Sequence, residues 1–244
     1  MRKKPDSIVR RRARKDTDKL RLREKILLAA RQELATGTAE SVSIQKIADA
    51  AGYSKATILK YFPSKIALLL FVKEKNLQEA VDRLEDVMQR EKEPIQRLRC
   101  VAVTYIEYWL ANPDHFKSLY TMAGTKEDRR LPDGTYFGQT PVARRSVEIF
   151  VECTEDLLRA AGATPSTETS RKLATLLFSA THGIISLPLG TPTMEWRDVA
   201  SNGSLVVDSL LCAWTMGIEA ARSERSWPKV SIKFLEQFMA TQNR

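Results

Sequence analysis

The spacing of three residues constrains the fold of this chain more than any other feature of the sequence. Ala48 is followed four residues later by Gly52, and six residues after that by Ile58. A small residue lets two helices cross closely, a glycine permits the tight turn between them, and an aliphatic residue fills the core beneath the second helix. Because Ser43 and Ser54 can cap the two helices, the segment is predicted to be a helix-turn-helix.

Apolar residues at helical spacing surround this segment. They predict a helix from Asp18 to Thr36, which ends at Gly37. They also predict a long helix that begins at Pro63 and Ser64 and ends at the stretch 91–94. Further helices are expected from Ile95 to Trp109, from Pro113, and over about 141–161, 165–187, 204–223 and 228–241. A glycine- and proline-containing loop is expected over 124–140, and the fold class is therefore all-α.

The positive charge is concentrated at the amino terminus. Residues 1–25 contain twelve Lys or Arg and four Asp or Glu, so this segment carries +8 of the net +9. Charge packed in this way repels itself and is expected to stay extended until a polyanion neutralises it. The two interpretations are a solvated tail and an arm that lies along phosphates or in a minor groove, with Arg10, Arg11 and Arg12 as contacts. The adjacent helix-turn-helix favours the second.

The sequence gives little evidence for a metal site, a cofactor site or a membrane span. Cys100, Cys153 and Cys212 are widely separated, with only two histidines available to join them, which favours buried reduced thiols in a cytoplasmic protein and no metal site. No cofactor-binding motif is apparent. The apolar stretches at 173–189 and 205–221 contain polar residues and are interpreted as buried helices of a soluble bundle, not membrane spans. No signal peptide is expected.

Residues 20–80 resemble the DNA-binding domain of the TetR family of regulators. The resemblance rests on the Ile26-x-x-Ala29-Ala30 run, Gly37, the helix-turn-helix residues from Ser43 to Ile58, Phe62 and Ser64-Lys65. It departs from the family at Leu59, where tyrosine is usual. The charge run predicts a flexible basic arm over 1–18. The resemblance implies a three-helix DNA-binding domain over 19–80, and a long helix joining it to a helical ligand-binding and dimerisation domain over 81–244.

The second helix of the motif, Ser54 to Tyr61, is expected to lie in the major groove. Its solvent face is expected to offer Lys55, Thr57 and Lys60 to bases or phosphates, with Tyr53 just before it. The resemblance implies phosphate contacts from three further residues: Ser43, Tyr61 and Lys65. Ser43 and Lys65 lie at or near helix starts, where anions are favoured, and Tyr61 lies at the end of the recognition helix.

The carboxy-terminal half resembles the ligand-binding half of the same family, and two patches resemble one subgroup of it, Asn112-Pro113-x-x-Phe116 and Thr181-His182-Gly183. A small-molecule pocket is hypothesised, lined by Tyr105, Tyr108, Trp109, Phe116, Tyr120, Phe178 and His182. A homodimer is also expected, because one short recognition helix reads few bases. Its interface is assigned to the helices at about 165–187 and 204–223, through Leu173, Leu177, Leu210 and Trp214, although burial in a core would give the same pattern.

The sequence is compatible with three functions. The leading one is a dimeric repressor that binds a palindromic operator on double-stranded DNA and is released by a small molecule. A second is a protein that coats DNA without sequence preference through the basic arm. The third is a helical enzyme using His182 or Cys153, which is disfavoured because no catalytic motif accompanies those residues. No membrane partner is expected.

Overall fold

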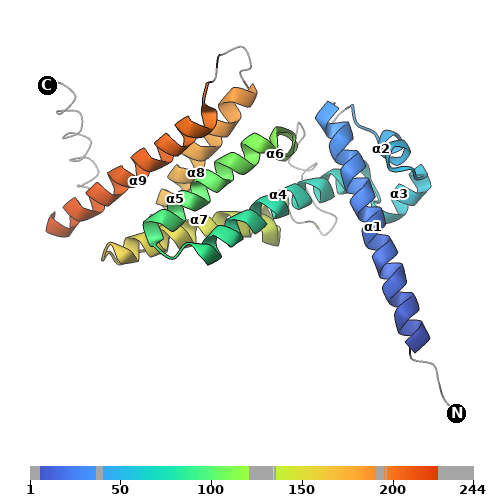
Figure 1. Cartoon of the computed structure of the whole chain (residues 1–244), viewed down its shortest axis with the longest axis horizontal. Helices are drawn as coiled ribbons and strands as arrows, with labels where there is room; N and C mark the ends of the chain where they lie inside the picture. Colours follow the sequence, from blue (N-terminus) through green and yellow to red (C-terminus); the bar gives the residue numbers. More distant parts are fainter. Residues whose placement is uncertain are drawn as a thin grey trace. The chain divides into compact units, whose positions relative to one another are not determined.

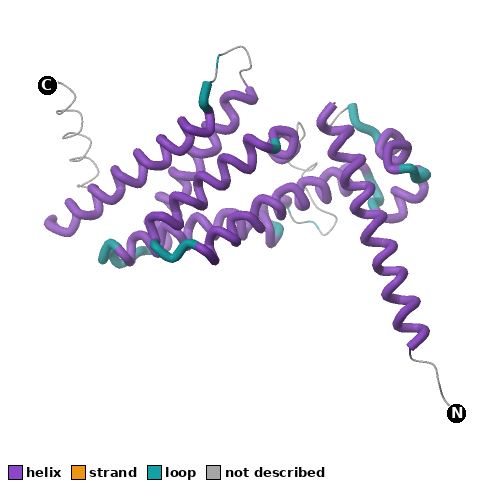
Figure 2. Tube along the Cα trace, viewed as in Figure 1, coloured by secondary structure: helices purple, strands orange, loops and turns teal. Residues whose placement is uncertain are grey.

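The computed structural model describes residues 6–36, 41–120, 134, 136–190, 195 and 197–224, which form helices joined by loops (Figure 2) and confirm the all-α class. Gly37, most of the loop at 124–140 and the helix expected over 228–241 lie outside the described residues. The elements are α1 (Asp6–Thr36), α2 (Ile44–Ala51), α3 (Lys55–Tyr61), α4 (Lys65–Arg90), α5 (Pro94–Ala111), α6 (Pro113–Tyr120), the 3₁₀ turn η2 (Phe137–Gln139), α7 (Pro141–Ala160), α8 (Thr167–Gly190) and α9 (Val199–Glu224) (Figure 1).

The chain divides into two compact units. The first combines Met1–Leu77 with Asp114–Thr140, and the second combines Gln78–Pro113 with Pro141–Arg244. The first unit therefore includes a stretch well beyond residue 80, where the sequence analysis ends the DNA-binding domain. Within this unit, the Asn76 side chain of α4 donates a hydrogen bond to the Ser118 hydroxyl of α6 over 3.1 Å.

The first helix begins twelve residues earlier than the sequence analysis predicts. α1 starts at Asp6, so most of the segment expected to be an extended, flexible arm over 1–18 is helical instead. Residues 6–16 contain no glycine or proline and are rich in arginine, which favours helix. The basic segment is thus a continuation of α1. The side chains of residues 6–16 lie outside the described set.

In the second unit, α5 packs against α7, α8 and α9. Its buried residues include Leu98, Ala102 and Ile106, and their burial supplies most of the stabilisation. Ion pairs add smaller contributions at the rim, where Arg99 of α5 meets Asp208 of α9 at 2.6 Å. The same ion pair lowers the pKa of Asp208, mainly through the hydrogen bond from the Arg99 guanidinium.

Among the described helices, α8 alone is long and apolar enough to cross a membrane by length and composition. A core helix of a soluble protein passes the same test. α8 packs against α5, α7 and α9, and its buried residues include Leu173, Leu177 and Ile185. These contacts agree with the interpretation of the 173–189 stretch as a helix of a bundle.

Close approach of α9 to its neighbours depends on a glycine. A methyl group built on Gly203 would lie 3.1 Å from the Ile106 side chain and 3.3 Å from Ile184, whereas one built on Gly217 would meet nothing within 4 Å. Gly203→Ala should therefore destabilise the fold by about 1–2 kcal/mol, because crowding outweighs the gain in helix propensity. Gly217→Ala is the matched control and should be neutral or stabilise by up to about 1 kcal/mol. Chemical denaturation measures both, and equal stability of the two variants would contradict the close approach.

Candidate nucleic-acid interface

α2 begins at a serine cap. Ser43 has an extended backbone with φ −128° and ψ 153°, and its hydroxyl accepts a hydrogen bond from the backbone N–H of Lys46 at 3.2 Å. Because a cap satisfies one of the N–H groups that have no partner within the helix, it fixes where the helix starts. The remaining free N–H groups and the helix dipole make this end attractive to an anion.

The turn between α2 and α3 depends on Gly52. Its φ is +72° and its ψ is 33°, a left-handed conformation that side chains rarely adopt. The N–H of Gly52 donates to the carbonyl of Asp49 at 3.2 Å, and the N–H of Tyr53 donates to the carbonyl of Ala48 at 2.9 Å. These two bonds satisfy the carbonyls at the end of α2 and redirect the chain into α3.

α3 starts at the second serine cap and exposes one face. The N–H of Thr57 donates to the hydroxyl of Ser54 at 3.1 Å, and the two hydroxyls lie 2.8 Å apart. Thr57 is half-buried and its hydroxyl contact with Ser54 is exposed, so its predicted contact with DNA stays a prediction. The exposed residues of α3 are the two predicted lysines and two that the sequence analysis did not select: Lys55, Ala56, Leu59 and Lys60.

A shared core holds α3 from behind. Ile26, Ala30, Ala48 and Ile58 are fully buried in one cluster contributed by α1, α2 and α3, and α4 adds Leu68 and Val72. Tyr53 and Tyr61, both predicted DNA contacts, pack against this cluster and are half-buried. Side chains on this rigid support can be presented to a ligand at a fixed spacing, which is the arrangement that a base-reading helix requires.

Further cations lie beside α3. Lys25 of α1 lies 5.9 Å from the ring centroid of Tyr53, and Lys46 of α2 is exposed. Neither was selected from the sequence. For Lys25 the reason is that helical periodicity does not show which turn of α1 lies next to Tyr53. Lys65 starts α4, where Ser64 accepts a hydrogen bond from the N–H of Ala67 at 3.1 Å. The side chains of Arg10, Arg11 and Arg12 lie outside the described set.

The predicted pocket residues fall into two groups. In the second unit, Tyr105 lies 6.0 Å from Trp109 and 5.4 Å from Phe178 between ring centroids, and Phe178 stacks on His182 at 5.9 Å. Tyr108 is edge-on to Trp109, and Phe150, which the sequence analysis missed, lies 5.6 Å from Tyr105. In the first unit, the rings of Phe116 and Tyr120 lie 4.6 Å apart.

These rings pack as a core, and a ligand would have to displace some of them. Tyr105 and Trp109 are at most 2% exposed. Burial also lowers the pKa of His182, so this imidazole is neutral at pH 7. An apolar, uncharged environment of this kind suits an apolar portion of a ligand.

The predicted interface residues are mostly buried within the chain. Leu173, Leu177 and Trp214 are buried within the chain itself, and Leu210 is half-buried. The neighbouring turns expose Leu176 and Leu187 on α8, and Leu205 and Met216 on α9, each at least half exposed. The sequence therefore identified the helices on which apolar residues are abundant but not the faces that remain open.

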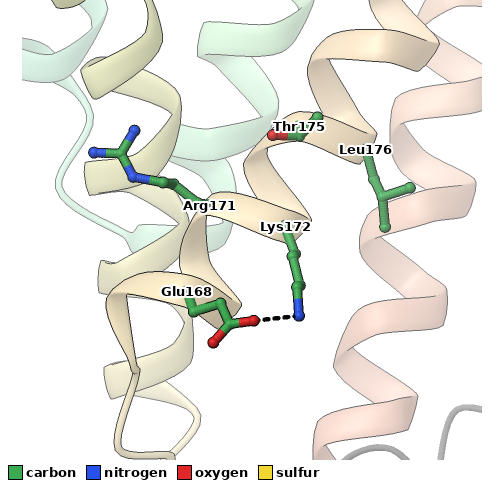
Figure 3. Close-up of a pocket in the computed structure, with 5 residues that line it drawn as sticks. All are labelled: Glu168, Arg171, Lys172, Thr175 and Leu176. Carbon is green, nitrogen blue, oxygen red and sulfur yellow. Dashed lines mark hydrogen bonds and ion pairs between the residues drawn. The ribbon is translucent and has the colours of Figure 1, made fainter.

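A groove of about 470 Å³ lies at the start of α8 (Figure 3). Its described lining consists of Glu168, Arg171, Lys172, Thr175 and Leu176, and Lys172 pairs with Glu168 at 2.6 Å. None of the predicted pocket residues lines it. The groove is shallow and open, and it continues the exposed surface of α8 at Leu176.

The cysteines differ from one another in exposure. Cys153 is buried, and burial raises the pKa of its thiol to about 12, which does not suit a nucleophile. Cys100 is half-buried, whereas Cys212 is exposed, so the prediction of three buried thiols is wrong for Cys212. Among the described residues, no group of three His, Cys, Asp or Glu side chains could hold a metal ion.

Two segments of the chain match families of known proteins. Residues 26–72 match the family described as bacterial regulatory proteins, tetR family. Residues 98–209 match the tetracyclin repressor-like, C-terminal domain. The first match covers α2, α3 and the parts of α1 and α4 that build their core, and the second covers most of the second unit.

Individual relatives agree with these matches. The nucleoid occlusion factor SlmA of Vibrio atlanticus is 30% identical over 118 residues, which are 48% of this chain and 60% of that protein. The chain thus spans only about three fifths of the length of that curated relative. Among solved structures, the transcriptional regulator FadR of Bacillus subtilis in complex with stearoyl-CoA has a TM-score of 0.65 at 15% identity, covering 77% of this chain and 97% of FadR. A TetR/AcrR family regulator of Thermobifida fusca has a TM-score of 0.56 at 20% identity, covering 78% and 95%.

Proposed function

The chain belongs to the TetR family of bacterial regulatory proteins, and from this premise we propose that it represses transcription as a homodimer on a palindromic operator and is released by a small molecule. Membership makes it a DNA-binding transcriptional regulator and not an enzyme, as the sequence analysis predicted. The observation that carries the proposal is the capped helix α3, which packs on a buried core and exposes Lys55 and Lys60. We expect this regulator to act in the cytoplasm, where its DNA is.

The exposed residues of α3 suggest how bases and phosphates are divided between side chains. Lys55 and Lys60 can reach guanine or phosphate, while Ala56 and Leu59 offer apolar contacts to thymine methyl groups. Thr57 is less suited to base contact than the sequence analysis expected, because its hydroxyl already lies against Ser54. Ser43, Tyr53, Tyr61 and Lys65 are assigned to phosphates, as is the basic first part of α1 with Arg10, Arg11 and Arg12.

Dimerisation is assigned to the exposed faces of α8 and α9. On α8, the positions 176, 180, 183 and 187 are separated by four, three and four residues. On α9, the positions 205, 209, 212 and 216 have the same separations. This spacing produces one stripe along each helix. The stripes are apolar or small, and their leucines are 50% to 65% exposed. The two stripes, each about 16 Å long and about 10 Å wide, offer on the order of 330 Å², so an interface of the standard ~800 Å² per partner would also include residues that flank them on α8 and α9.

The effector is inferred to carry a long apolar portion. The rings of Tyr105, Trp109 and Phe178 form an uncharged aromatic cluster inside the second unit. FadR of Bacillus subtilis, which has a similar fold, was solved with stearoyl-CoA. Acyl compounds are therefore the first class of effector to test. Release would follow from tighter binding to a form of the dimer in which the recognition helices are wrongly spaced for the operator.

A second candidate is a nucleoid-associated role, favoured by the similarity to nucleoid occlusion factor SlmA. It corresponds to the DNA-coating alternative from the sequence analysis. Mapping the bound sites in cells separates the two, because a repressor should occupy few promoters and a nucleoid factor should occupy many sites spread over the chromosome.

Selection of bound duplexes from a random pool tests the function directly. The expected result is one palindrome, bound more tightly than unrelated DNA by ~10³ or more at physiological salt. In a fluorescence anisotropy assay with the recovered duplex, stearoyl-CoA should release the protein and free coenzyme A should not. Similar affinity for all duplexes would favour DNA coating instead.

Substitutions of two lysines should separate phosphate contacts from base contacts. Lys65→Ala should weaken binding to every sequence and reduce the slope of log affinity against log salt by about one. Lys60→Ala should cost ~1–3 kcal/mol on the selected duplex and relax preference at one position, if it reads a base. Titration of matched and mutated duplexes at several salt concentrations measures both, and a uniform loss from both variants would mean that these roles are wrongly divided.

A lysine introduced into the α9 stripe should break the dimer. Leu205→Lys removes ~1.5–3 kcal/mol of apolar burial from each copy and introduces a charge, so the dimer dissociation constant should rise by at least about 100-fold. Val147→Lys on α7 is the matched control, since Val147 is 43% exposed and lies outside both stripes. Sedimentation velocity checks the result, and a dimer that persists in Leu205→Lys would place the interface elsewhere.

A further inference from the structure

The groove at the start of α8 is open to solvent and suits a helix better than a small molecule. Its lining residues Lys172 and Glu168 form an ion pair whose side chains are 72% and 77% exposed, and Leu176 is 57% exposed. A small ligand needs most of its surface buried, which so open a groove cannot provide. An amphipathic helix needs only one apolar face covered, so this surface fits a helix that lies in the groove.

The groove lies at the end of the second unit where α9 finishes. A methyl group built on Gly203 of α9 would lie 3.3 Å from Ile184, so α9 starts beside the end of α8. Because the two helices pack against each other, α9 runs back toward the start of α8. Met216 is 13 residues after Gly203, and Arg171 is 13 residues before Ile184, so Met216 and Arg171 lie at the same level. The last turns of α9 therefore pass the groove, and α9 ends at Glu224 about 12 Å further on.

The residues that follow α9 lie outside the described set, but their sequence is that of an amphipathic helix. Twenty residues follow Glu224, and the sequence analysis predicts a helix over 228–241. At about 100° per residue, five apolar residues fall within an arc of about 140°, and two lysines and a glutamate fall on the opposite side. The apolar face consists of Trp227, Val230, Phe234, Leu235 and Phe238.

The proposed dimer needs more surface than its two stripes provide. The stripes offer on the order of 330 Å² per copy, against the ~800 Å² per partner of a standard interface. A helix over 227–238 is about 18 Å long, so its face, about 10 Å wide, covers about 180 Å² of a groove. If each copy gives one such helix and receives one, the buried surface rises to roughly 700 Å² per partner.

We propose that residues 227–238 of each copy form an amphipathic helix that lies in the groove at the start of α8 in the partner copy. This inference rests on the proposed function, because it takes α8 and α9 as the dimer interface. The groove is continuous with that interface through Leu176, which Figure 3 shows on the side of α8 where α9 runs. The same segment placed on its own α8 would cover Leu176 and leave less surface for the second copy. The partner's α8 is therefore the site that completes the dimer.

One substitution tests whether the segment contributes to the dimer. Phe234→Glu places a charge on the apolar face of both segments, so the dimer dissociation constant should rise by about 100-fold or more. Ala240→Glu is the matched control, since it adds the same charge beside Lys233 and Glu236 on the other face, and it should leave dimerisation unchanged. A chain that ends at Glu224 should behave like Phe234→Glu. Sedimentation velocity measures the dissociation constant of each variant.

Disulfide formation shows which copy receives the segment. Two chains of different length are produced together, one with Leu176→Cys and the other with Phe234→Cys. Both carry Cys212→Ser, because Cys212 is an exposed thiol on the same surface. With oxidised glutathione, the two kinds of chain should become linked to each other, and a non-reducing gel separates the mixed product by its size. Ala240→Cys in place of Phe234→Cys should give no mixed product.

The outcomes distinguish this inference from the proposed function. An unmodified chain that stays monomeric would reject the proposed dimer, and the exchange of segments with it. A dimer that is equally stable in Phe234→Glu and in the chain that ends at Glu224 would overturn the role of the segment while the dimer stands. A missing mixed disulfide, or a chain with both cysteines that links only within one copy, would overturn the exchange between copies.

Discussion

The packing of Ile58 in a core shared with Ala48 and Ala30 is the interaction on which the DNA-binding half of this chain depends. All three side chains are fully buried, and each comes from a different helix. A seven-residue helix has little stability in isolation, because nucleation costs more than a few hydrogen bonds return. α3 is therefore held by tertiary packing and by its serine cap. Its exposed face is free to carry lysine, alanine and leucine, none of which is needed for the fold.

Much of this half could be predicted from the sequence because its determinants are local. A serine cap, a left-handed glycine and an aliphatic residue act within a few positions of one another, so their spacing alone specifies α2, the turn and α3. The start of α1 was harder to predict. Charge repulsion argued for an extended arm over 1–18, yet strong helix formers without a glycine or proline continue α1 back to Asp6. The hydroxyl contact between Thr57 and Ser54 was not predicted either, since helical periodicity does not show which side chains bond to a cap.

The hydrogen bonds of Asn76 to Arg31 and Ser118 could not be predicted, since they join residues that no sequence pattern relates. In the sequence, Asn76 is only a single polar residue within a long amphipathic helix. Its role becomes visible only when α1 and α6 bring a donor and an acceptor to its two ends. A buried amide satisfied on both sides is costly to disturb on either side.

The carboxy-terminal half shows why apolar abundance is an ambiguous signal. The leucines of α8 at 173 and 177 fill the core of their own chain, while Leu176, between them, is 57% exposed. Hydrophobicity and spacing alone did not tell these neighbours apart, because both faces of the helix are apolar. Leu173 and Leu177 are buried because α5, α7 and α9 cover one face of α8, whereas the face that carries Leu176 is left open. An exposed stripe of apolar or small residues on each of two adjacent helices costs solvation free energy in a monomer. A second copy of the same surface would remove that cost, and it would bring a second recognition helix to the DNA.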